Sequence, residues 1–136
     1  MTIIGFNLRK ISVEKKETIK GQVNVKTNLK ITDIKEEKAI AEISKDRTAL
    51  KFDFEFGINY EPKIATINFL GHVLSIEEEK KAKKILSEWK DKKIEVDLRT
   101  KVTNMIWIKC NIKAFLLEEE IGLPIHIPLP RLTAQK

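Results

Sequence analysis

Two segments of the chain alternate strictly between two kinds of side chain. Val, Thr, Leu or Ile occupies every second position from Val23 to Ile31, and an apolar side chain occupies every second position from Leu50 to Tyr60. A period of two puts alternate side chains on opposite faces of a β-sheet, so each segment is predicted to bury one face. Pro62 ends the second strand because proline donates no ladder hydrogen bond.

The N-terminal segment also alternates, but its phase changes part-way. Residues 4–13 keep one phase as far as Leu8 and take the opposite phase from Ile11 onward. One extra residue in a strand produces such a shift, so the pattern predicts a β-bulge near Arg9 and Lys10.

A fourth strand is predicted over residues 64–76, which are apolar on both faces. This pattern is typical of a strand covered on both sides, here by helices and by another subunit. Between the second and third strands, residues 35–38 predict a turn, and Ile40 and Ile43 are predicted to extend that hairpin.

The second half of the chain changes to the period of α-helices. Ser75 and Glu78 match a capping box, which predicts a helix over residues 77–93. Its buried stripe follows i, i+3, i+4, i+7 spacing and consists of Ala82, Ile85, Leu86 and Trp89.

A longer helix is predicted over residues 97–121. Gly122 ends it, since glycine suits the left-handed position that follows many helices. The predicted buried stripe consists of Leu98, Val102, Met105, Ile112 and Leu116. Trp107 lies off this stripe, as an anchor of a subunit interface or as part of a binding groove.

The order of elements predicts one α+β domain over residues 1–136, a four-stranded antiparallel sheet followed by two helices packed on one face. After the long helix, prolines hold residues 124–130 extended. The apolar side chains of this tail, Ile125, Ile127 and Leu129, are expected to be buried against the sheet or a partner.

Composition indicates a folded protein of the cytoplasm. The formal charge is +6, and residues 1–76 and 77–136 each carry 13 basic and 10 acidic side chains, so the charge is not clustered as in many nucleic-acid binders. No signal peptide and no membrane-spanning segment are predicted. Cys110 is the single cysteine, which excludes an internal disulfide. The abundance of Lys, Glu and Ile resembles a thermophile's proteome.

Residues for catalysis or metal binding are sparse. His72, His126 and Cys110 lack metal-ligand spacing, so neither a metal nor a cofactor is expected. Cys110 lies within an apolar helix and is predicted to be a buried structural thiol. His126 is expected to be exposed or bonded to backbone, and Glu118 to solvate a helix end. No glycine-rich phosphate loop is present, so an enzyme is not expected.

Three short patterns resemble the SecB-like chaperone family. Residues 6–14 resemble its first strand, and residues 69–76 resemble the end of its fourth strand, where a glycine precedes an apolar-Ser-Ile close. Gly122-Leu123-Pro124, with Pro130 further on, is similar to the family's glycine and prolines after the main helix. The resemblance covers nearly the whole chain.

The resemblance implies an ATP-independent holdase that binds unfolded polypeptide clients and that assembles as a dimer of dimers. A role in protein transport is a further expectation that the resemblance by itself does not imply. We place the client-binding side chains at Phe6, Leu8, Val25, Leu29, Phe54, Trp107, Ile125, Ile127 and Leu129. Two features depart from the family. The chain is basic, and residues 132–136 lack the Cys and His of the family's zinc-binding tail, so docking on the SecA motor is not expected.

Three other functions stay open at this point. The first is a dedicated chaperone within a toxin–antitoxin system, and the second is a basic sheet protein that binds RNA. The third is a structural subunit whose apolar surfaces are all used in its own oligomer. The alternation of Phe52, Phe54 and Phe56 could stack bases, although core packing is the favoured interpretation. Nucleic acid and membrane insertion are therefore not expected.

Overall fold

The computed structural model describes residues 2–38 and 46–134. Four strands and two helices follow one another along the chain: β1 (Thr2–Lys15), β2 (Asn24–Glu36), β3 (Arg47–Glu61), β4 (Ala65–Glu78), α1 (Glu79–Trp89) and α2 (Val96–Ile121). This order confirms the predicted α+β class. No helix in the part of the chain that the structure describes is long and apolar enough to span a membrane.

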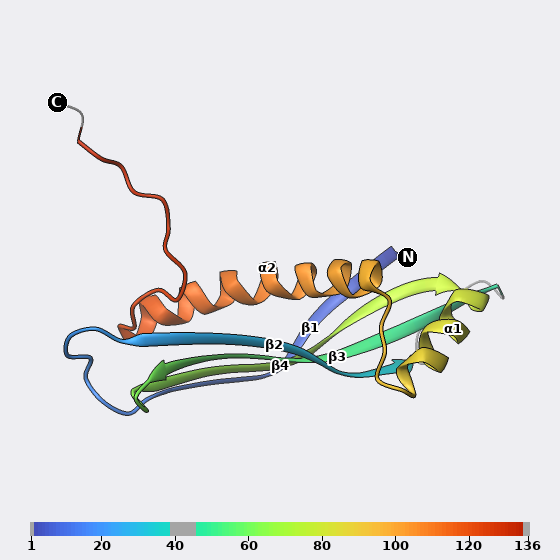
Figure 1. Cartoon of the computed structure of the whole chain (residues 1–136), viewed down its shortest axis with the longest axis horizontal. Helices are drawn as coiled ribbons and strands as arrows, with labels where there is room; N and C mark the ends of the chain where they lie inside the picture. The colour runs from blue at the N-terminus through green and yellow to red at the C-terminus, as the bar shows by residue number, and fades with distance from the viewer. Residues whose placement is uncertain (1, 39–45, 135–136) are drawn as a thin grey trace.

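The sheet has the strand order β1-β4-β3-β2, and each neighbouring pair is antiparallel. β1 and β2 therefore form its two edges. Both helices contribute to the core on one face of the sheet, as predicted. α2 runs along the sheet, and α1 lies near the end where α2 begins (Figure 1).

The core lies between α2 and alternate residues of the two central strands. The even-numbered side chains of β3 from Leu50 to Tyr60 are almost inaccessible to solvent, as the period of two predicts. Phe56 stacks on Phe69 of β4 with ring centroids 5.7 Å apart. At Gly71 a Cβ atom would lie 2.3 Å from the carbonyl oxygen of Asn7 and 2.8 Å from the ring of Phe54, so only glycine fits there.

The edge strands are irregular. The predicted bulge in β1 is confirmed by a register shift between Leu8 and Lys10, and a second shift, between Ile3 and Gly5, was not predicted. β2 continues through Glu36, so the predicted turn over residues 35–38 begins too early. The predicted hairpin extension at Ile40 and Ile43 lies outside the described residues.

The predicted capping box before α1 is wrong, whereas the predicted cover of β4 by another subunit stays a prediction. Ser75 lies within β4, and Glu78, the residue before α1, makes no side-chain capping bond. Because β4 continues to Glu78, the residues of the predicted capping box belong to a strand and not to the start of a helix. The outer face of β4, with half-buried Leu70 and Leu74, is covered by no helix in the described parts of the chain.

The bounds of α2 match the prediction to one residue, but its buried side does not. The core row consists of Val102, Ile106, Cys110, Ala114 and Glu118. Ile112 and Leu116, predicted to be buried, are 57% and 54% exposed. The helix is apolar on several sides, so the periodicity could not fix which side faces the sheet.

Candidate functional site

A groove opens between the edge strand β2 and the first half of α2. Two adjoining hollows of about 550 and 340 Å³ form it, and Leu29 and Thr103 line both. We call this surface the β2–α2 groove; it is lined by Leu29, Lys30, Ile31, Thr32, Trp89, Lys92, Ile94, Arg99, Thr103, Asn104 and Trp107. Its apolar side chains come from a strand, both helices and the segment between the helices.

Helical spacing directs one row of α2 toward the groove. Arg99, Thr103 and Trp107 follow each other at intervals of four residues and therefore share one side of the helix. Trp107 is 38% exposed, and its ring meets Phe56 edge-on with centroids 6.0 Å apart. The groove thus presents an accessible aromatic side chain that rests on the core.

The strand side of the groove is a free sheet edge. Among the described residues β2 pairs only with β3, so its outer backbone N–H and C=O groups have no ladder partner. Leu29 and Ile31 lie opposite the buried Phe56 and Phe54, which places both side chains on the helix-covered face. An extended chain can pair with such an edge while its side chains contact an apolar surface.

Trp89 is fixed at the end of the groove nearest α1. Its indole Nε1 donates to Asp33 Oδ1 at 3.0 Å, and Lys92 Nζ lies 4.5 Å from the centre of its ring system. Desolvation acts to raise the pKa of Asp33, but hydrogen bonds from Trp89, Lys35 and the Ile34 amide outweigh it and lower the pKa. Asp33 therefore acts as a charged acceptor that orients Trp89.

The structure distributes the predicted client-binding residues over several places. Leu29 and Trp107 line the groove, and Val25 lies further along β2 on the same face, half-buried. Phe6 and Leu8 lie on β1, at the opposite edge.

Phe54 is a correction to the prediction. It is fully buried and stacks on Phe6 with centroids 5.5 Å apart, so it belongs to the core and not to an accessible surface.

Sequence reasoning missed much of the groove. Ile31 has the same strand phase as Leu29, and Arg99 and Thr103 lie in the same helical row as Trp107, so the sequence pattern could have placed these three residues in the groove. No pattern could have placed Ile94 there, because it lies between the two helices and belongs to no periodic segment.

The predicted tail residues lie at the other end of α2. Leu123 is buried, Ile127 is half-buried, and Ile125 and Leu129 are 44% and 51% exposed. The tail is therefore buried only where it leaves the helix. Beyond that point Leu132 is fully exposed.

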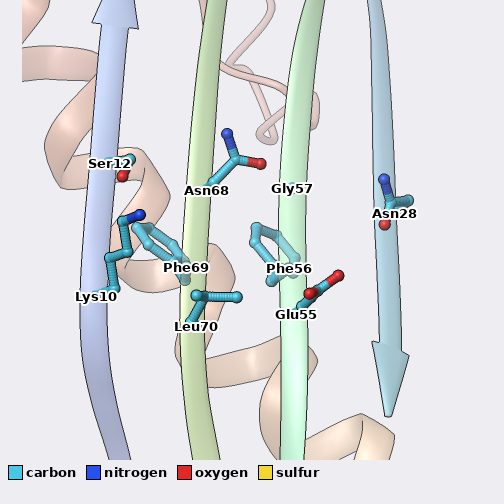
Figure 2. A pocket seen from close by; sticks show the side chains of 9 residues that line it. All are labelled: Lys10, Ser12, Asn28, Glu55, Phe56, Gly57, Asn68, Phe69 and Leu70. Atoms are coloured by element: carbon cyan, nitrogen blue, oxygen red, sulfur yellow. The ribbon is translucent and has the colours of Figure 1, made fainter. Parts of the chain in front are cut away.

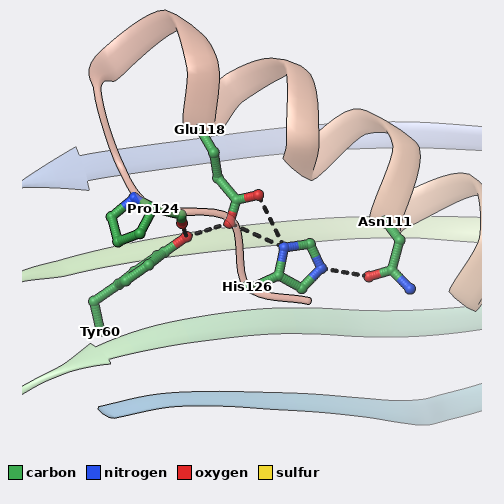
Figure 3. A network of polar contacts seen from close by, with 5 residues as sticks. All are labelled: Tyr60, Asn111, Glu118, Pro124 and His126. Carbon is green, nitrogen blue, oxygen red and sulfur yellow. Dashed lines mark hydrogen bonds and ion pairs between the residues drawn. The ribbon is translucent and has the colours of Figure 1, made fainter. Parts of the chain in front are cut away.

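A buried polar network holds the start of the tail (Figure 3). Tyr60 Oη donates to Glu118 Oε2 and lies 2.7 Å from the carbonyl oxygen of Pro124. His126 Nδ1 lies 2.9 Å from both carboxylate oxygens of Glu118, and its Nε2 lies 2.7 Å from Asn111 Oδ1. Each ring nitrogen therefore faces an oxygen atom of a neighbouring side chain.

This network overturns two predictions. The side chains of His126 and Glu118 are both inaccessible to solvent, whereas we expected His126 to be exposed or bonded to backbone and Glu118 to solvate the helix end. Glu118 continues the core row of α2, four residues after Ala114. With the correct helical phase, the sequence would have signalled a buried carboxylate that needs a partner.

A polar hollow of about 330 Å³ lies on the outer face of the sheet (Figure 2). Gly57 lacks a side chain there, and a Cβ atom would lie 3.0 Å from Asn68 Oδ1 and 3.7 Å from Asn28 Nδ2. Lys10 and Glu55, which carry opposite charges, complete its polar lining. The hollow follows from the missing side chain and offers no apolar surface comparable with the groove.

The structure bears on two further interpretations. Cys110 is fully buried, and this burial raises the pKa of its thiol to about 12, as expected of a structural cysteine. Phe52, Phe54 and Phe56 are at most 1% exposed. They cannot stack bases, which removes the residues on which the RNA hypothesis depended.

Comparison with known proteins shows the fold. No protein-family model matches the chain, and no curated protein matches it. A solved structure of the SecB-like chaperone Rv1957 from Mycobacterium tuberculosis, in complex with a ChAD peptide from the Rv1956 HigA1 antitoxin, matches with a TM-score of 0.56. The match covers 99% of this chain and 92% of that one at 12% sequence identity. The chain has a SecB-like fold. At this identity the likeness concerns architecture alone.

Proposed function

We propose that this protein is an ATP-independent chaperone that holds non-native polypeptides, and that it binds their extended segments in the β2–α2 groove. The observation that carries the proposal is an apolar groove beside a free strand edge. The fold adds support, because the similar Rv1957 chain is a chaperone solved with a bound peptide. No enzymatic step is part of the proposal.

The driving force would be burial of apolar surface. Each Å² of apolar surface removed from water contributes about 25 cal/mol. Leu29, Ile31 and Trp107 offer such surface without close shape demands, and the edge of β2 offers hydrogen bonds that any backbone can make. Binding of this kind tolerates many sequences, as a holdase requires.

Self-association is part of the proposal. Ile108, Ile112 and Leu116 form a row on α2 directed away from the core, and each is more than half exposed. We assign this row to contact between copies of the chain in a dimer of dimers. Several grooves on one assembly would bind one long client with high avidity. Sedimentation of Ile112→Glu tests this: the variant is expected to be smaller than wild type, and an unchanged size contradicts the assignment.

Light scattering of an unfolding model protein tests the holdase directly. Wild type is expected to suppress aggregation at near-stoichiometric ratios, at both low and high salt. Trp107→Ala is expected to lose most of this activity. Lys109→Ala, at an exposed position of α2 outside both the groove and the Ile108 row, serves as the control and should keep it. Failure of wild type to suppress any client overturns the general holdase.

A dedicated chaperone is the second candidate, favoured by the antitoxin peptide in the Rv1957 structure. It predicts that several unrelated unfolded proteins aggregate unprotected, while a single partner encoded beside this chain becomes soluble on co-expression. Protection of unrelated clients contradicts this alternative. Delivery of clients for export stays an untested prediction.

A further inference from the structure

The β2–α2 groove carries charge of one sign. Lys92 and Arg99 line its helix side and Lys30 its strand edge, and none of the lining residues is acidic. Lys30 alternates with Leu29 and Ile31 and lies opposite Glu55, so its side chain belongs to the outer face of the sheet. Within residues 2–38 and 46–134, no carboxylate forms a salt bridge with any of these three side chains. The nearby carboxylate of Asp33 is already bonded to Trp89 and Lys35.

This charge is local and does not simply reflect the net charge of +6. A second cleft, between α1 and α2, is lined by four carboxylates, Glu77, Glu88, Glu95 and Asp97, and by three lysines, Lys81, Lys84 and Lys101. The two clefts border the same helix, yet only the groove beside the free strand edge lacks negative charge.

We propose that the groove selects extended polypeptide segments whose helix-facing side chains include both apolar and acidic ones. In a strand added to the edge of β2, successive side chains point to opposite faces. The set that faces the helices would contact Leu29, Ile31 and Trp107 and would also lie beside Lys92 and Arg99, while the other set would point to the outer face of the sheet. This inference rests on the proposed function, and it specifies which clients the same groove prefers.

A peptide suits the groove better than a nucleic acid does. The side chains beside the cations are aliphatic, Leu29, Ile31 and Ile94, and Lys92 already lies over the indole of Trp89. Phosphate groups would pair with the cations but would leave these aliphatic side chains exposed to water. An acidic-apolar peptide satisfies both.

The test uses the full chain and three peptides of equal length in which every second residue is Thr. The positions between are alternately Leu and a test residue, which is Glu, Gln or Lys in the three peptides, so that apolar and test side chains share one face. At low salt the Glu peptide is expected to bind about tenfold more tightly than the Gln peptide, with the Lys peptide weakest. High salt is expected to remove the difference but not the binding of the Gln peptide.

Charge variants locate the effect. Lys92→Gln combined with Arg99→Gln is expected to abolish the preference for Glu over Gln. Lys80→Gln combined with Lys109→Gln, two exposed lysines outside the groove, changes the net charge equally and should preserve it.

Each contrary result has its own meaning. Equal affinity for the Glu and Gln peptides, or equal loss in both double variants, overturns the inference while leaving the holdase intact. Displacement of the Glu peptide by single-stranded RNA of equal charge also overturns it. Absence of binding by all three peptides sinks the proposed function itself.

Discussion

The two ends of the space between α2 and the sheet differ, because one is closed and polar and the other is open and apolar. At the C-terminal end, Tyr60, Glu118 and His126 form a buried network, and the tail folds over it. At the N-terminal end, Trp107 and Leu29 line an open apolar groove beside an unpaired strand edge. One helix therefore borders both a sealed polar site and an accessible apolar one.

The difference shows where stability and binding reside. A buried carboxylate is tolerated only when its partners are present, so the sealed end is fixed by its own contacts. An accessible indole beside a free edge gains from contact with another chain. Changes at the sealed end should therefore affect folding, and changes at the open end should affect binding.

Loss of Glu118 is expected to have the largest effect. Glu118→Ala leaves the Tyr60 hydroxyl and the His126 ring without their shared acceptor, and each buried polar group left unsatisfied costs about 1–3 kcal/mol. Urea unfolding measures the loss. Glu119→Ala, at the exposed neighbouring position, is the control and should change the free energy of unfolding by less than about 0.5 kcal/mol. Similar effects at both positions would mean that the network stabilises nothing.

The next largest effect is expected from alkaline pH, which should lower the free energy of unfolding through two buried groups. Burial, with the hydrogen bond and charge of Glu118, raises the pKa of Tyr60, and burial raises the pKa of Cys110 to about 12. The unfolded chain releases these protons at lower pH than the folded chain does. The contribution of the two groups to the free energy of unfolding is therefore fully present below pH about 9 and is lost as pH rises above it.

Single variants separate the two groups. In urea titrations across alkaline pH, Cys110→Ala is expected to delay the onset of this fall, and Tyr60→Phe to reduce its later part. Identical pH profiles for wild type and both variants would assign the alkaline loss to other groups.

Trp107→Ala is expected to lower stability by only about 1 kcal/mol, since its edge contact with Phe56 is the main interaction lost inside the protein. Its effect on client binding should be far larger, measured by aggregation suppression beside urea unfolding. A variant that loses stability and binding in parallel would show that the groove is part of the fold and not a separate site.

Truncation of the tail is expected to have the smallest effect on the free energy of unfolding. Ending the chain at Pro128 removes Leu129 and Leu132 but keeps His126 and Pro124. The free energy of unfolding should change by less than about 0.5 kcal/mol, because Leu129 and Leu132 are 51% and 102% exposed. Client binding measured on the same variant tests the prediction that Leu129 contacts clients: unchanged affinity removes it from the site.

Prediction from sequence succeeded for the buried face of β3 and for the stripe of α1 and failed for part of the buried face of α2. In β3 apolar and polar residues alternate, so a single phase was available and the buried row was predicted correctly. In α2, Ile108, Ile112 and Leu116 are more hydrophobic than the Cys110, Ala114 and Glu118 that are buried. Hydrophobicity alone chose the wrong residues because a close helix–sheet contact needs small side chains as well as apolar ones.

The candidate site was only half predictable for a related reason. Leu29 and Trp107 each belong to a periodic element, whereas Lys92 and Ile94 lie between the helices. Glu118 looked like one of three solvated glutamates, and nothing local to it reveals the histidine that bonds to it from the tail.

By itself the sequence determined the order of elements, the bulge after Leu8 and the buried face of β3, because these depend on neighbours one to four residues apart. Only the tertiary structure decided which side of α2 faces the sheet, which strands form the edges and where the charges gather. These depend on contacts such as that of Tyr60 with Glu118, 58 residues away along the chain, which no local pattern records.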